Sequence, residues 1–271
     1  MPTSGTRRAV WRRIYRSPLA DIIQFILLAL LVVWFFARST ESLGYDWQWG
    51  RIPSFLYDFN ADGFTWGPLM VGLMVTFQIS GISLVLAFII GLTTALFRLS
   101  DSFVARTVAQ IYLETSRNTP LLIQLFFIYF VVGPVIGLGR FPSAVLALSL
   151  FEGAYASEIF RAGIVSIHRG QREAAYSLGL SGWDTYRFVI LPQAVRRVLP
   201  PLTSQAVSLV KDSALVSTIA IYDLTMQAQT LIAETFLTFE LWLTVGGMYL
   251  VVTTALSLVV NYLENRLRVA A

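Results

Sequence analysis

The stretch "REAAYSLGLSGWDTYRFVILPQAVRRVLP" runs from Arg172 to Pro200 and lies between two long apolar segments. A connection between two helices usually needs only a few residues, whereas this one is long, polar and patterned. Ala174, Ala175 and Leu178 recur at helical spacing, and a glycine at position 179 is a natural helix stop. We therefore predict a short helix that ends at Gly179 and whose small residues let another backbone approach closely.

A second short helix is predicted directly after this glycine. Ser181 with Asp184 three residues later resembles a capping box, although glutamate is the usual partner of the serine. The pair Leu191–Pro192 is expected to end this helix or to kink it. The stretch then consists of two short helices with a glycine hinge. On these residues alone it could equally be an amphipathic connector that lies on a lipid surface.

The composition is that of a membrane protein. Of 271 residues, 56% are hydrophobic and only 13% are charged, whereas soluble domains carry about 25% charged residues. The chain has no cysteine, which excludes disulfides, thiol catalysis and thiolate metal sites. Its one histidine, His168, leaves little room for metal chemistry, so we expect neither a metal site nor a catalytic residue.

Membrane-spanning segments follow from apolar runs of about 20 residues. We predict an all-α integral membrane protein, because open strands cannot satisfy their backbone groups in lipid. The first segment also resembles a secretory signal, but its apolar run is long for one and an uncleaved span is favoured. About six transmembrane helices are expected, near residues 19–37, 67–97, 107–132, 141–162, 198–221 and 241–263.

Arginine is distributed unevenly between the ends of these segments. Fifteen arginines lie at one set of ends, and only Arg38, Arg51 and Arg140 lie at the other. By the positive-inside rule, both termini and the opening stretch are cytoplasmic. The loop that holds Trp47, Trp49 and Trp66 is then external, and we expect these rings to anchor it at the membrane interface.

The domain organisation follows from these segments. We expect residues 1–66 to comprise a basic cytoplasmic N-terminus, the first transmembrane helix and an external loop. Residues 67–271 then form one membrane domain, and the polar loop within it extends over about 163–197.

Several spaced motifs carry a resemblance to a known family. Glu173-Ala174-Ala175, then Gly179, then Ile190-Leu191-Pro192 resembles the EAA signature of ABC importer permeases. "RNTPLLIQLFFIYF" (117–130), "GAYASEIFRAGIVSIHRGQ" (153–171) and "LVKDSALVSTIAIYDL" (209–224) resemble the polar amino acid subfamily, of the histidine/glutamine/glutamate type. The resemblance covers about residues 67–268. The sequence departs from the family pattern at Asn118, where many relatives have glycine. It also has an additional first span, whereas many relatives have five spans.

This resemblance implies a fold, a function and partners. It implies the ABC type I importer permease fold with an extra N-terminal helix, in a multi-pass protein of the bacterial inner (cytoplasmic) membrane. The chain would be the permease subunit of an ATP-driven importer of polar amino acids, with glutamate/aspartate as the favoured subgroup. The expected partners are an ATP-binding subunit dimer, a second permease protomer (identical or homologous), an extracytoplasmic amino-acid-binding protein and membrane lipid, but no nucleic acid.

In this family the EAA loop is a coupling helix that fits a groove on the separate ATPase subunit. The positions that match the motif are Glu173, Ala174, Ala175, Gly179, Leu191 and Pro192. A P-loop needs the sequence G-x-x-x-x-G-K-[ST], but the single lysine, Lys211, follows Val210. We therefore expect a transport subunit rather than an enzyme, with no cofactor bound directly and with ATP and Mg²⁺ used by the partner.

Ionisable residues within the predicted spans are the candidates for the substrate path. They are Glu152 and Glu158 in the fourth span and Lys211 and Asp212 in the fifth. Such charges could instead only hold the bundle together, for instance through a pair of Lys211 with either glutamate. Glu158 could also form a surface pair with Arg161. Glu152 is the stronger substrate candidate, since nothing in its own helix neutralises it, and Gln124 and Ser213 offer neutral hydrogen bonds.

Three other classes of membrane protein fit less well. A secondary transporter usually contains paired repeats with broken helices, and no repeat is apparent. An intramembrane enzyme would need a motif such as G-x-S-x-G or H-E-x-x-H, and neither is present. Nothing resembles the filter ring of a channel.

Overall fold

The computed structural model of the chain describes residues 22–31, 34, 38, 44–60 and 63–267. The chain divides into two compact units, Met1–Gln48 and Trp49–Ala271, and each is described by itself. In the first unit a short apolar helix covers Ile22–Leu31. The basic N-terminus and the rest of the predicted first span lie outside the described residues. The expected boundary between residues 66 and 67 stays a prediction.

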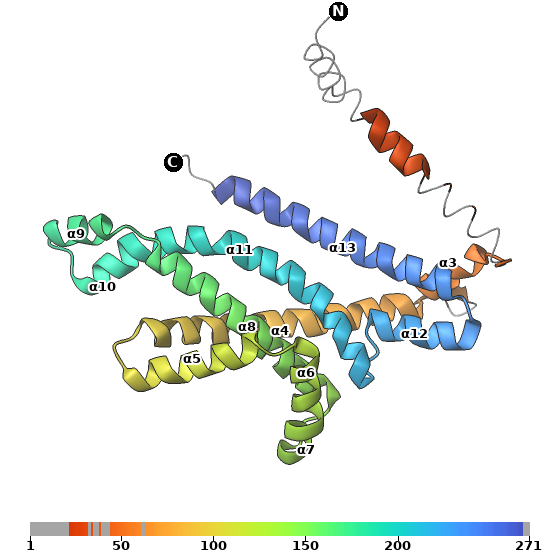
Figure 1. Ribbon diagram of the computed structural model, residues 1–271, viewed down its shortest axis with the longest axis horizontal. Coiled ribbons are helices and arrows are strands. Elements are labelled where there is room, and N and C mark those ends of the chain that lie inside the picture. Colours follow the sequence, from red (N-terminus) through yellow and green to blue (C-terminus); the bar gives the residue numbers. More distant parts are fainter. Residues whose placement is uncertain (1–21, 32–33, 35–37, 39–43, 61–62, 268–271) are drawn as a thin grey trace, which may run out of the picture. The chain divides into compact units, whose positions relative to one another are not determined.

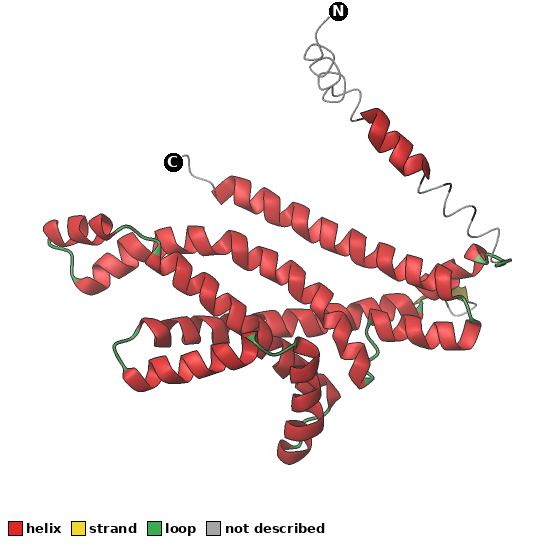
Figure 2. Cartoon of the chain, in the orientation of Figure 1, coloured by secondary structure: helices red, strands yellow, loops and turns green. Residues whose placement is uncertain are grey.

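The second unit is built almost entirely from helices, with one two-stranded hairpin (Figures 1 and 2). Its elements in chain order are η1 (Trp49–Arg51), α3 (Ile52–Leu56), β1 (Tyr57–Asn60), β2 (Gly63–Trp66), α4 (Pro68–Leu99), α5 (Phe103–Arg117), α6 (Leu121–Phe126), η2 (Phe127–Val132), α7 (Gly133–Ile136), α8 (Arg140–Val165), α9 (Arg169–Ser177), α10 (Gly182–Asp184), η3 (Thr185–Ile190), α11 (Leu191–Asp212), η4 (Ser213–Ile219), α12 (Leu224–Thr235) and α13 (Thr238–Leu267). Here η1 and η4 are 3₁₀-helical, and η2 and η3 are π-helical.

Three described helices are long and apolar enough to cross a membrane: α4, α8 and α13. The 32 residues of α4 extend over about 48 Å, which exceeds a hydrocarbon core of about 30 Å. This helix begins with a proline at its first position, where a missing N–H leaves no bond unmade. Figure 1 shows α9 and α10 at one end of this unit and α3 at the other; we name these the loop end and the far end.

The predicted span at 107–132 is not one straight helix. A bend of 108° separates α5 from the helical segment Leu121–Ile136. The break falls at Asn118–Thr119–Pro120, because proline disfavours helical backbone in the residue before it. The side-chain amide of Gln124 donates to the carbonyl oxygens of Ser116 (2.7 Å) and Thr119 (3.1 Å), which have lost their helical partners at the break.

Small residues bring α4 and α8 into close contact at the centre of the unit. A Cβ atom at Gly91 would lie 2.9 Å from the carbonyl oxygen of Gly153 and 2.7 Å from Cβ of Ala156. Ser83 and Ser149 are fully buried beside this contact, and Ser149 donates a hydrogen bond to the carbonyl of Ser83. This is the packing by which membrane helices associate, since lipid provides no hydrophobic drive between them.

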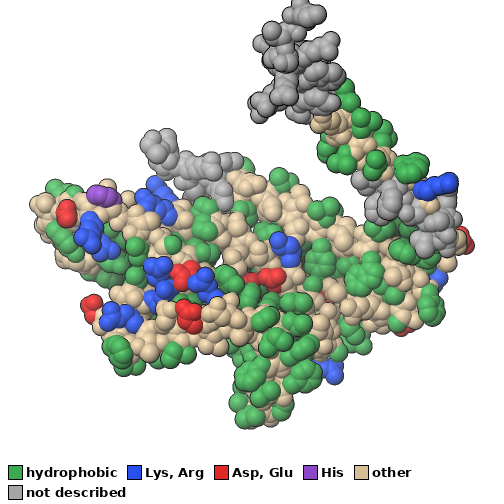
Figure 3. Space-filling view, in the orientation of Figure 1, with side chains coloured by type: hydrophobic (Ala, Val, Ile, Leu, Met, Phe, Trp, Pro, Cys, Tyr) green, Lys and Arg blue, Asp and Glu red, His purple; other side chains and the backbone are tan. Residues whose placement is uncertain are grey.

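The outward surface of this bundle is apolar. Val85 on α4 and Leu250 and Val251 on α13 have 61%, 67% and 69% of their surface exposed. In Figure 3 hydrophobic side chains lie over much of the visible face, and charged side chains gather mainly toward the loop end. A surface of this kind is stable against lipid rather than water, so the prediction of an all-α integral membrane protein is confirmed.

Candidate functional site

The EAA loop, defined as residues 163–197, begins with a capped short helix. The imidazole Nδ1 of His168 accepts a hydrogen bond from the backbone N–H of Gly170 at the start of α9. At the other end Gly179 adopts a left-handed conformation (φ +78°), and the N–H of Leu180 donates to the carbonyl of Ala175. This pattern ends a helix through the left-handed backbone conformation, which glycine adopts without steric strain. The predicted helix stop at Gly179 is confirmed.

The second half of the EAA loop is one continuous helix rather than a short one. The Ser181 hydroxyl caps it as predicted, accepting from the N–H of Asp184 (3.1 Å) and donating to its carboxylate (2.6 Å). Of the two expected alternatives at Leu191–Pro192, the end of the helix is wrong, because η3 continues directly into α11. A proline ring clashes with the carbonyl four residues earlier, here that of Phe188, and η3 widens the helix around that residue so that it continues into α11. The fifth predicted span, 198–221, therefore begins within α11 and extends through η4 to two residues beyond it.

The surface of the EAA loop combines small and large apolar residues that face outward. Ala175 is buried within the loop, whereas Glu173 and Ala174 are exposed. Leu178 and Trp183 have 82% and 73% of their surface exposed. Apolar side chains that project from an otherwise polar loop indicate a surface for another macromolecule.

The EAA loop is joined tightly to the two helices that it connects. At the end of α8, Gly163 lies directly against the side chain of Val198 in α11, with no room for a Cβ atom. The Arg197 guanidinium donates to the carbonyl of Ser166 and to its hydroxyl (2.8 Å). Within the loop, the guanidinium of Arg172 lies 5.9 Å from the centre of the Tyr186 ring. The base of the EAA loop is therefore held together by direct contacts between the end of α8 and the start of α11.

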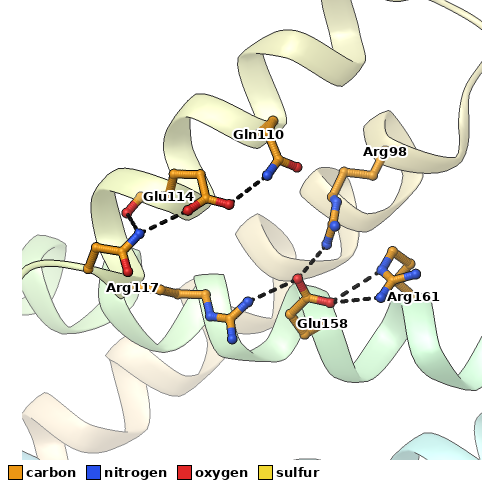
Figure 4. Close-up of polar contacts among 7 residues, drawn as sticks. Arg98, Gln110, Glu114, Arg117, Glu158 and Arg161 are labelled. Atoms are coloured by element: carbon orange, nitrogen blue, oxygen red, sulfur yellow. Dashed lines mark hydrogen bonds and ion pairs between the residues drawn. The ribbon is translucent and has the colours of Figure 1, made fainter.

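Three arginines from three helices surround Glu158 (Figure 4). Its Oε1 accepts from Arg98 of α4 (2.6 Å) and from Arg117 of α5 (3.1 Å). Its Oε2 accepts from Arg161 (3.2 Å), which lies one turn further along α8. The expected pair with Arg161 is thus present, but it is part of a larger cluster with two positive charges in excess. A carboxylate held by three guanidiniums is poorly suited to bind a substrate ammonium group.

Glu152 lies six residues earlier on α8 and has very different neighbours. Its side chain is 2% exposed, and its Oε2 accepts a hydrogen bond from the amide of Gln205 in α11, while its Oε1 has no partner among the described residues. Asp212, also of α11, is close enough to interact with it electrostatically. The adjoining cavity of about 40 Å³ has room for water but not for an amino acid, so the site is closed in this structure.

The remaining substrate-path candidates lie apart from this carboxylate. Lys211 is exposed and forms no ion pair in the described part of the chain, so the expected alternatives in which it neutralises Glu152 or Glu158 are not observed. Ser213 is fully buried and donates to the carbonyl of Val210 within its own helix (2.8 Å). Gln124 is engaged at the bend between α5 and α6, where it lines an apolar cavity of about 580 Å³.

Gln205 was missed by sequence reasoning, although a signal existed. It lies seven residues before Asp212, which places the two side chains near one face of a helix. No group of three or more histidine, aspartate or glutamate side chains that could hold a metal occurs in the described residues.

A bundle of lipid-facing helices with a compact, exposed loop that is tied to two of them has the architecture of an ABC importer permease. A family model described as "Binding-protein-dependent transport system inner membrane component" matches residues 83–269. The chain belongs to this family.

Relatives and solved structures agree with this assignment. The chain is 39% identical over 206 residues to a glutamine transport system permease protein of Escherichia coli K12, covering 74% of this chain and 94% of the relative. It is 35% identical over 232 residues to a glutamate/aspartate import permease protein of Escherichia coli O157:H7, covering 82% and 99%. The crystal structure of an amino acid ABC transporter with histidines matches with 35% identity and a TM-score of 0.69, covering 73% of this chain and 94% of that one. The predicted type I importer permease fold is confirmed.

Proposed function

We propose that the protein is the permease subunit of an ATP-driven importer for polar amino acids, with glutamate and aspartate as the favoured substrates. The observation that carries this function is the EAA loop, whose exposed apolar surface is fixed to α8 and α11 through Gly163, Val198 and Arg197. The glutamine and glutamate/aspartate permeases among its relatives support the substrate class.

In this proposal the EAA loop docks on a dimer of separate ATP-binding subunits. Glu173, Ala174 and Ala175 belong to the docking helix, Gly179 terminates it, and Leu191–Pro192 lies where the loop continues into α11. The partner binds ATP and Mg²⁺ and performs hydrolysis, and this chain binds no cofactor directly. The absence of a G-x-x-x-x-G-K-[ST] motif from the sequence supports this division.

The proposed topology places the loop end in the cytoplasm, together with both termini, and the far end outside. The arginine bias supports this orientation. Because the chain has no cysteine, single cysteines can test it. Gly50 and Gly182 are matched positions, since a Cβ atom at either would meet nothing within 4 Å. A membrane-impermeant thiol reagent added outside should label Gly50→Cys and not Gly182→Cys, and the reverse would contradict the topology.

The proposed substrate path passes between α8 and α11. Glu152 and Asp212 would bind the ammonium group of a zwitterionic amino acid, and the exposed Lys211 would meet its carboxylate. Because the cavity beside Glu152 is too small for the substrate, motion of the EAA loop would have to separate the two helices. The complete transporter also requires a second permease protomer, identical or homologous, and an extracytoplasmic amino-acid-binding protein.

Reconstitution tests the proposed function. The permease in proteoliposomes with its ATPase and binding protein should take up glutamate or aspartate only when ATP is present. Uptake that needs an ion gradient and no ATP would instead favour a secondary transporter.

A matched pair of glycine substitutions tests the docking loop. Gly179→Ala places a side chain in a left-handed conformation, which costs about 1–2 kcal/mol, whereas Gly182→Ala does not. We expect Gly179→Ala to weaken association with the ATPase, and Gly179→Asn to do so less because asparagine tolerates this conformation. Equal association of Gly179→Ala and Gly182→Ala with the ATPase would contradict the role of this helix end.

A further inference from the structure

The hairpin β1–β2 at the far end has one aromatic face. Tyr57 pairs with Trp66 and Phe59 pairs with Phe64, so all four rings project from the same side. Asp58 lies between Tyr57 and Phe59 in the sequence, so its side chain projects from the opposite side of the hairpin. The hairpin is therefore amphipathic, with rings on one face and a carboxylate on the other.

The four rings form a continuous and exposed ridge. Neighbouring ring centres lie 5.8 Å (Tyr57–Phe59), 5.4 Å (Phe59–Phe64) and 4.8 Å (Phe64–Trp66) apart, each pair edge to face. Between 44% and 73% of each side chain is exposed. Such a ridge is unfavourable in water, which indicates that something covers it.

The base of the hairpin is fixed to the rest of the unit. The N–H of Gly67 donates to the carbonyl of Leu56 (2.9 Å), and Gly67 lies so close to the backbone of Phe55 that no other residue fits. Below it, Ile52 of α3 is buried in a cluster with Leu69 of α4 and apolar residues of α12 and α13. The direction in which the ridge faces is thus set by the helical bundle.

We propose that this aromatic face rests in the lipid headgroup region of the membrane. The ridge is followed directly in sequence by a lipid-facing helix, because α4 begins two residues after Trp66 and exposes Val71 and Met74 in its first turns. Aromatic rings prefer the headgroup depth, whereas aliphatic side chains prefer the hydrocarbon. A two-stranded hairpin also has two unpaired backbone edges, which water must satisfy, so it cannot enter the hydrocarbon.

Neighbouring positions on one strand test the proposal. Two single-cysteine variants are compared: Phe59→Cys on the ring face and Asp58→Cys on the opposite face. Each carries a nitroxide label and is reconstituted in lipid nanodiscs. The collision rates of the nitroxide with oxygen and with a water-soluble nickel chelate are then measured. Oxygen concentrates in lipid, and the chelate stays in water. We expect the ratio of oxygen to chelate collisions to be high at residue 59 and low at residue 58. Val85→Cys, on the lipid-facing side of α4, provides the reference for lipid exposure.

Two outcomes would overturn the proposal. If the nitroxide at residue 59 collides mainly with the chelate, to the same extent as the nitroxide at residue 58, the ridge lies in water. Chelate-dominated collisions at residue 59 that disappear only when the extracytoplasmic binding protein is added would assign the face to a protein partner. If Phe59→Cys does not assemble, Phe64→Cys and Thr65→Cys provide the same comparison on β2, since Phe64 is on the ring face and Thr65 pairs with Asp58.

Discussion

Glu158 and Glu152 lie on the same helix, α8, but their side chains have very different neighbours. Glu158 is the centre of a cluster with Arg98, Arg117 and Arg161, which come from three helices. Glu152, two turns away on α8, is almost fully buried beside an amide and a second carboxylate, and one of its oxygens has no partner among the described residues. The first charge is over-compensated, and the second has no positive partner there.

This difference separates two roles that a hydropathy profile cannot distinguish. A buried charge is costly unless it is paired, so one that persists without a partner needs another reason to be present. Glu158 has a structural reason, because it ties α4, α5 and α8 together. Glu152 bonds to Gln205 of α11 but has no positively charged partner in the described part of the chain, which supports the proposal that it binds the ammonium group of the substrate.

The largest expected effect is loss of stability in Glu158→Gln. Removal of one partner from a buried ion pair costs about 3–5 kcal/mol, and the partial exposure of this cluster reduces the expected loss to about 2 kcal/mol. Thermal unfolding in detergent measures this loss. Glu114→Gln is the control, since Glu114 is an exposed glutamate of the neighbouring helix whose partners among the described residues are Gln110 and Asn118 (Figure 4). Equal unfolding temperatures for the two variants would remove the structural role of Glu158.

Glu152→Gln should behave in the opposite way. We expect normal assembly and a fall in uptake of about tenfold or more, because a hydrogen bond to a charged group contributes about 1.5–3 kcal/mol. Membrane abundance and ATP-dependent uptake are the two measurements.

Lys211→Met provides the second half of that test. Since Lys211 forms no ion pair with Glu152 in the described structure, adding this substitution to Glu152→Gln should restore nothing. If Glu152→Gln instead lowered abundance and Lys211→Met restored it, the two residues would be a structural pair.

The smallest expected effect is the loss of stability when single arginines around Glu158 are replaced. Arg161→Gln should lower stability by only about 0.2–0.5 kcal/mol, because Arg161 pairs within its own helix and is 36% exposed. Arg98→Gln should cost more, since Arg98 is 19% exposed and joins α4 to α8 at 2.6 Å. Unfolding temperatures measured in parallel test this order, and a greater loss for Arg161→Gln would reverse it.

The EAA loop was the region that sequence reasoning described best. The end of α9 at Gly179 and the cap at Ser181 depend on nearest neighbours along the chain, so their residue types carry the information. The residues did not decide between a helix end and a continuing helix at Pro192, because the π-helical widening that accommodates the proline leaves no mark in composition.

Features that depend on distant residues were out of reach. Arg98 and Arg117 are 60 and 41 positions from Glu158, so only the assembled helices bring them together. The bend at Asn118–Pro120 lies inside a run whose average hydropathy is high, and a window of about 20 residues averages over a three-residue break. The aromatic face of β1–β2 needed the strand register, which the single tryptophans did not reveal.

The π-helical segment η3 has a consequence for the direction in which the EAA loop faces. A π turn contains about one residue more than an α turn, and one residue corresponds to about 100° of rotation around the helix axis. Thr185–Ile190 therefore sets the angular phase between α10, which carries the exposed Trp183, and α11. Deleting one residue there would preserve nearly every side chain of the loop, yet it would rotate the exposed apolar surface by about a quarter turn. Variation in length within these six positions would thus act as a change of docking direction.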